Sequence, residues 1–180
     1  MKKITERLNI HHTLSFKMLI AIVENCPGTH WISDDENESI WKRVLHVLES
    51  MDFWFDDFSD YHFNRLFENF SAEMDKYNKS ILTKNNMFKY LDLINVKIQN
   101  FFVMLNDDML LETSSKHSSV AYLDIIVSQI RHIQINIGYC NEKFNSKGIK
   151  SSEWLGYNEE NAKDRWRPLA NGLSARKKSN

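Results

Sequence analysis

Residues 128–140 read SQIRHIQINIGYC and lie in the strongest helical pattern of the chain. Apolar residues recur every three or four positions through this stretch, as on the buried side of a helix. His132 and Asn136 are four residues apart, so they share one face of that helix. This spacing allows two ligands on one metal ion, although an amide oxygen is a weaker ligand for zinc or nickel than an imidazole nitrogen.

The composition predicts one helical domain. The chain has 180 residues, of which 42% are hydrophobic and 26% are charged, and this is long enough and apolar enough for a full core. It contains 5 glycines and 2 prolines, too few for the many tight turns of an all-β protein. We therefore expect an all-α fold built from long helices.

Charge and cysteine usage exclude several classes of protein. The net charge is -1, from 23 basic and 24 acidic residues, which argues against nucleic acid as a partner. Cys26 and Cys140 are too far apart in sequence for a metal-type pair, and we expect two buried or partly buried thiols in a reducing cytoplasm. Neither a signal peptide nor a span of ~20 apolar residues is evident, so the predicted location is cytoplasmic and no membrane partner is expected.

Hydrophobic periodicity predicts four main helices, at about residues 9–25, 38–55, 83–106 and 118–146. Between the second and third lies a predicted crossover at residues 62–80, which contains a short amphipathic helix. This connection is long enough to carry the chain along the whole bundle, so the second and third helices can run parallel.

Three histidines precede the quoted stretch on predicted helices. We expect His11 and His12 to be exposed, because no partner motif surrounds them. His46 points away from the centre of the apolar arc of its helix, so it is predicted to face either solvent or a polar pocket.

Acidic residues gather after the second predicted helix. Oxygen-rich clusters can bind calcium, but the spacing here matches no calcium loop and no glycine is present for its sharp turn. We therefore interpret the cluster as a solvated helix end. Its members are Asp52, Asp56, Asp57, Asp60 and His62.

Common catalytic motifs are missing from the sequence. It has no Glu-x-x-His of the ferritin type, no His-x-x-x-His, no phosphate-binding glycine loop and no serine nucleophile elbow.

Two helical stretches together resemble one family. Residues 40–50 read IWKRVLHVLES and residues 129–139 read QIRHIQINIGY. Their order, the long gap between them and the helix lengths are similar to those of the DinB-like (YfiT-like) superfamily of bacterial proteins, over roughly residues 8–155. The resemblance implies a DinB-like domain over residues 1–157, which leaves residues 158–180 as a polar, basic tail.

The resemblance implies an up-down-down-up four-helix bundle, often dimeric, with a divalent metal held by three histidines. The first two histidines match His46 and His132, and Asn136 occupies the third position. The implied metal is zinc or nickel, with an affinity lowered by the amide. We expect these three residues to converge in a shared pocket even if no metal is bound, and we expect a homodimer.

The resemblance also suggests two functions. One is a metal-dependent thiol S-transferase or hydrolase that acts on a small molecule, with a low-molecular-weight thiol as cosubstrate. The alternative is a binding or stress-associated protein that keeps the fold without the metal, and Asn136 favours it. DNA repair is a third reading, but the charge balance opposes it.

Overall fold

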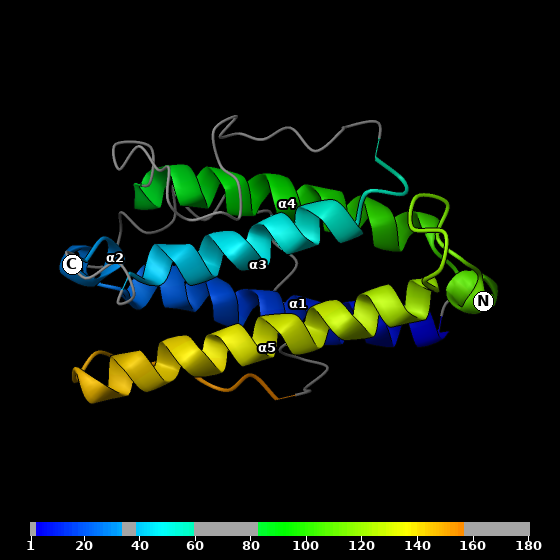
Figure 1. Ribbon diagram of the computed structural model, residues 1–180. Coiled ribbons are helices and arrows are strands. Elements are labelled where there is room, and N and C mark those ends of the chain that lie inside the picture. Colours follow the sequence, from blue (N-terminus) through cyan, green and yellow to red (C-terminus); the bar gives the residue numbers. More distant parts are fainter. Residues whose placement is uncertain (1–2, 34–38, 60–82, 157–180) are drawn as a thin grey trace, which may run out of the picture.

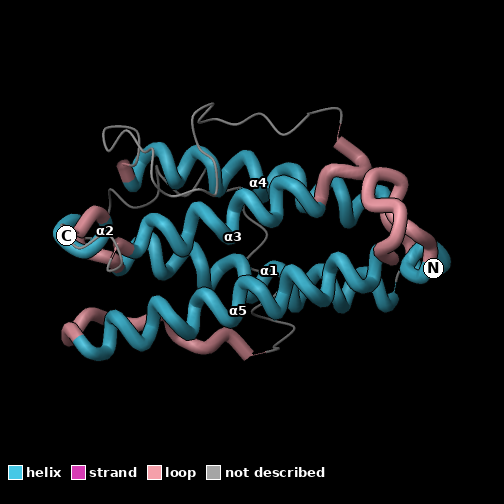
Figure 2. The backbone as a smooth tube through the Cα atoms, in the orientation of Figure 1, coloured by secondary structure: helices cyan, strands magenta, loops and turns pink. Residues whose placement is uncertain are grey.

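The structure is a computed structural model that describes residues 3–33, 39–59 and 83–156 (Figure 1). These residues form helices and loops with one isolated β-bridge, Thr113–Ala121, and no strand (Figure 2). The expected all-α class is therefore confirmed. The predicted crossover and the basic tail lie outside the described residues. The elements are α1 (Lys3–Asn25), α2 (Gly28–Trp31), α3 (Ile40–Trp54), α4 (Lys84–Met104), the 3₁₀ helix η3 (Asp107–Leu111) and α5 (Tyr122–Ser146).

The four long helices lie alongside one another, with α1 and α5 running opposite to α3 and α4 (Figure 1). Early α3 meets late α5 where Arg43 contacts Tyr139, and late α3 meets early α5 where Ser50 contacts Gln129. At the start of α4, Lys84 donates to backbone carbonyls at the end of α1. These contacts fix the direction of each helix relative to its neighbours.

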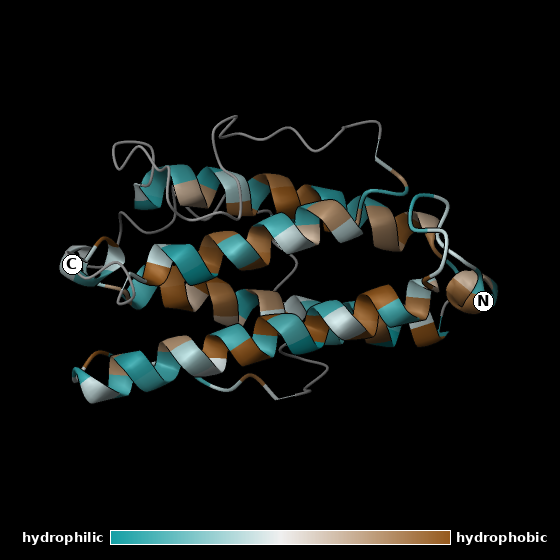
Figure 3. Ribbon diagram, in the orientation of Figure 1, coloured by the Kyte–Doolittle hydropathy of each residue, from teal (hydrophilic) through white to brown (hydrophobic). Residues whose placement is uncertain are grey.

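The core is built from apolar residues that recur along each long helix among polar ones (Figure 3). All four helices contribute side chains with at most 1% of their surface exposed, among them Ile22, Val44, Leu91 and Ile126. Burying one such side chain contributes about 1.5–3 kcal/mol before the cost of chain ordering. In the described ranges, none of the helices has the length and apolar character that crossing a bilayer would require.

Helix α1 begins six residues earlier than the periodicity predicts. One oxygen of Asp107, Oδ1, accepts from the backbone N–H groups of Ile4 and Thr5 at 3.1 and 2.8 Å, and from the Thr5 hydroxyl at 2.9 Å. A carboxylate in this place satisfies N–H groups that have no partner within the helix and faces the positive end of its dipole. Because this cap comes from a residue about a hundred positions away, local sequence pattern does not reveal it.

Candidate functional site: a histidine pair between α3 and α5

Polar side chains line the contact between α3 and α5, and we call this row the α3–α5 seam. Successive members are three or four residues apart on each helix, so each set projects from a single face. The antiparallel packing brings the two faces together. The seam consists of Arg43, His46 and Ser50 from α3 and of Gln129, His132, Asn136 and Tyr139 from α5.

His46 and His132 meet at the middle of the seam. Their Nε2 atoms are 3.0 Å apart, with the ring planes at 89° and the ring centroids 4.8 Å apart. Such a hydrogen bond needs one protonated and one unprotonated Nε2, so the two rings cannot both be imidazolium. Burial lowers the pKa of both histidines, and nearby charge, from Arg43 for His46 and from His46 for His132, lowers it further.

The other ring nitrogen of His132, Nδ1, is buried. Among the residues that the structure describes, it has no hydrogen-bond partner. A histidine that binds a metal through Nε2 usually donates its Nδ1–H to a carboxylate, a carbonyl or water, which fixes the tautomer and the ring orientation. His132 lacks this support in the structure.

Asn136 follows His132 by one helical turn and is 5% exposed. Its amide Nδ2 donates to the backbone carbonyl of His132 at 2.9 Å. The structure therefore records Asn136 in contact with its own helix, whereas His46 and His132 contact each other across the seam.

The side chains at the seam fall short of a complete zinc or nickel centre. Two imidazole nitrogens bound tetrahedrally to zinc at about 2.0–2.1 Å would lie about 3.3 Å apart, so the 3.0 Å spacing is near that of two ligands. A catalytic zinc site uses three protein ligands. Over residues 3–33, 39–59 and 83–156, no group of three or more histidine, cysteine or acidic residues could hold a metal ion.

Arg43 is a member of the seam that sequence reasoning missed. Its guanidinium carbon lies 4.1 Å from the centroid of the Tyr139 ring, one helical turn from His46. In the sequence, Arg43 lies three residues before His46, which places both on one face of α3. Its role in the seam becomes visible only from its contact with Tyr139, which lies two turns after His132 on α5. The neighbouring arginine on α5, Arg131, is exposed.

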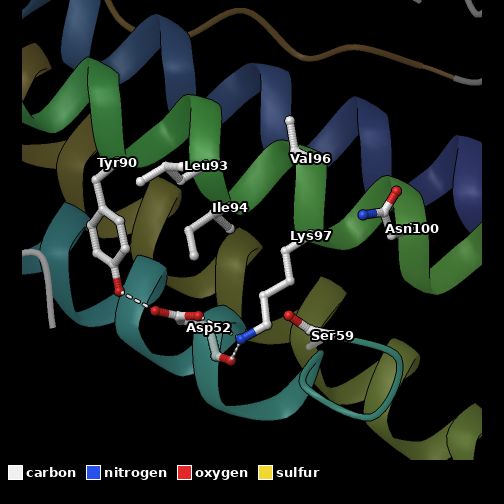
Figure 4. A pocket seen from close by; sticks show the side chains of 8 residues that line it. All are labelled: Asp52, Ser59, Tyr90, Leu93, Ile94, Val96, Lys97 and Asn100. Atoms are coloured by element: carbon white, nitrogen blue, oxygen red, sulfur yellow. Dashed lines mark hydrogen bonds and ion pairs between the residues drawn. The ribbon is translucent and has the colours of Figure 1, made fainter. Parts of the chain in front are cut away.

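A second polar cluster lies on the other side of α3, against α4 (Figure 4). Asp52 is 0% exposed, its Oδ1 is 2.6 Å from Lys97 Nζ, and its Oδ2 accepts from the Tyr90 hydroxyl at 2.9 Å. The Lys97 ammonium also lies 2.9 Å from Asp56 Oδ1. These groups border a cavity of about 210 Å³ with walls of Leu93, Ile94 and Val96.

The interpretation of the acidic residues as a solvated helix end is therefore wrong for the three that the structure describes. Asp52 and Asp56 pair with Lys97, and Asp57 accepts from the Ser114 hydroxyl at 2.7 Å and the Tyr122 hydroxyl at 2.8 Å. Burial alone would raise the pKa of Asp57, but these hydrogen bonds outweigh it and hold that pKa below its usual value. Asp60 and His62 lie outside the described residues.

The prediction for His12 is also wrong. This side chain is 1% exposed and packs among Phe16, Phe55 and Phe102, with ring centroids 5.1–6.4 Å away. Within the described part of the chain its Nε2 has no hydrogen-bond partner, and burial lowers the pKa of the ring to about 3. His11 is exposed, as predicted.

Both cysteines are free and buried. Burial raises the pKa of Cys26 to about 11 and that of Cys140 to about 12. Because the thiolate is the nucleophile, neither residue is suited to covalent chemistry near neutral pH.

Comparison with models of known protein families, with curated proteins and with solved structures gave no match to this chain. The DinB-like resemblance therefore rests on the two helical stretches and their order.

Proposed function

We propose that this chain is a DinB-like protein in which the three-histidine metal site of the family is reduced to His46 and His132. In this proposal the seam binds a small molecule without a resident metal, in a binding or stress-associated role. The observation that carries the proposal is the engagement of Asn136, at the third family position, with its own helix: its amide donates to the backbone carbonyl of His132 at 2.9 Å, which leaves two imidazoles facing each other across the seam.

The directions of the helices support the family assignment. Helices α1 and α5 run one way and α3 and α4 the other, as in an up-down-down-up bundle (Figure 1). The two histidines matched to the family come from α3 and α5 and face each other, which is the arrangement that the family motif requires.

A metal-dependent thiol S-transferase or hydrolase is the second candidate. It is favoured by the near-ligand spacing of the two Nε2 atoms and by their access to solvent, since His46 is exposed and His132 is partly buried. When bound, zinc or nickel would act as a Lewis acid toward a thiol or water. For Asn136 to serve as a third ligand, its amide would have to break its hydrogen bond to the backbone carbonyl of His132 and turn toward the metal.

Elemental analysis of protein purified without chelator or a nickel resin separates these two candidates. We expect well under one zinc or nickel per chain. Near-stoichiometric metal that is lost in His46→Ala and in His132→Ala would contradict the proposal and favour the enzyme, and assays for thiol transfer and hydrolysis would follow.

We also propose a homodimer in a reducing cytoplasm. Val96 and Val103 support the dimer, because they are 58% and 67% exposed and, seven residues apart, lie on one face of α4. The two free cysteines fit a reducing compartment. Light scattering on the purified full chain tests the dimer, and a monomer mass at all concentrations would contradict it.

A further inference from the structure

Among the residues that the structure describes, the seam contains an arginine that forms no ion pair with a carboxylate. Arg43 is partly buried, and its guanidinium carbon lies over the Tyr139 ring at 4.1 Å. In the part of the chain that the structure describes, no carboxylate forms an ion pair with Arg43. A cation–π contact uses the charge of the guanidinium and does not itself use its N–H donors in a hydrogen bond to an acceptor atom.

Arg43 is also close to the histidine pair. It lies one turn before His46 on the same face of α3, where Cβ atoms are about 5–6 Å apart. A second cation, the Lys143 ammonium, lies 5.7 Å from the centroid of the Tyr139 ring. The Arg43 guanidinium therefore lies beside the Tyr139 ring and one helical turn from the exposed His46.

We infer that Arg43, together with the adjacent His46, forms a binding point for the carboxylate group of a small molecule. This inference rests on the proposed function, in which the seam binds a small molecule without a metal. The planar fork of a guanidinium matches a carboxylate with two parallel N–H···O hydrogen bonds. One unpaired fixed cation matches the single negative charge of a carboxylate better than the nearly double charge of a phosphate.

Nuclear magnetic resonance on the full chain tests this inference, with sodium acetate as the probe and sodium chloride keeping the ionic strength constant. We expect a saturable shift of the Arg43 Nε–Hε signal and of the His46 ring protons. Arg43→Gln should abolish the saturable shift at His46. Arg43→Lys, which keeps the charge and loses the fork, should weaken acetate binding about tenfold. The matched control, Arg131→Gln, removes an exposed arginine of α5 and should leave acetate binding unchanged.

Three outcomes would overturn the inference. The first is a linear, unsaturable response to acetate in the wild-type chain. The second is equal saturation in Arg43→Gln, checked as folded by circular dichroism. The third is saturation by inorganic phosphate but not by acetate. Zinc and nickel are measured in the same samples. Metal-free protein that ignores acetate contradicts this inference alone, whereas metal-loaded protein that binds acetate through Arg43 contradicts the proposed function alone.

Discussion

The Nε2 atom of His46 lies 3.0 Å from the Nε2 atom of His132, although the two residues are 86 positions apart in the chain. This contact depends on the antiparallel packing of α3 and α5, which also pairs Ser50 with Gln129 at 3.1 Å. This hydrogen bond engages the two Nε2 atoms that a shared metal ion would use as ligands. The seam therefore holds a defined polar contact between α3 and α5.

Lys97→Met should destabilise the protein strongly, because it leaves the fully buried Asp52 without its cation. Removing one partner of a buried ion pair costs about 3–5 kcal/mol, whereas replacing both partners by apolar groups is often nearly neutral. We therefore expect the double variant Asp52→Leu/Lys97→Met to recover most of the loss in the free energy of unfolding, measured with urea.

The matched control for Lys97 is Lys150, whose pair with Glu153 is exposed. Lys150→Met should change the free energy of unfolding by less than about 1 kcal/mol. Equal losses in the two lysine variants would contradict a structural role for the buried cluster.

Asp107→Ala should loosen the start of α1, because the Asp107 carboxylate accepts from the N–H groups of Ile4 and Thr5. Hydrogen exchange should show faster exchange at residues 4–8 than in the wild type. Asp108→Ala is the control, since Asp108 is exposed and adjacent, and equal effects of the two variants would refute the cap.

His12 should make the protein less stable in mild acid. Burial lowers the pKa of His12 from 6.5 to about 3, so below pH 6.5 the unfolded chain binds a proton on this ring that the folded chain does not. The free energy of unfolding should therefore fall as the pH falls from 6.5 toward 3, by up to about 1.4 kcal/mol per pH unit from this group.

Urea unfolding at pH 7 and pH 5 measures this contribution. His12→Phe keeps an aromatic ring among its neighbours and should flatten the pH dependence, while His11→Gln, at an exposed position, should leave it as in the wild type. An unchanged pH dependence in His12→Phe would show that the ring is not kept neutral by the fold.

Hydrophobic periodicity and residue spacing predicted the features of the structure that depend on residues close together in the chain. The apolar periodicity located the four long helices, and the four-residue spacing placed His132 and Asn136 on one face of α5. The polar position of His46 on its helix also followed from the pattern. The sequence did not reveal interactions whose partners lie far along the chain.

Three residues show this limit. Asp107, which follows α4, accepts from the first N–H groups of α1, Lys97 pairs with the buried Asp52, and Phe55 and Phe102 pack against His12 from outside its own helix. In each case tertiary packing decided the outcome, and no spacing within a single helix encodes it.

Zinc titration of the wild type beside Asn136→His tests the central claim most directly. The substitution supplies the third imidazole of the motif that the proposed DinB-like resemblance implies. If the seam is a reduced metal site, we predict that the wild type binds zinc weakly, that Asn136→His binds it more than about tenfold more tightly, and that His46→Ala abolishes this gain. Tight, stoichiometric zinc in the wild type, or no gain in Asn136→His, would contradict the account.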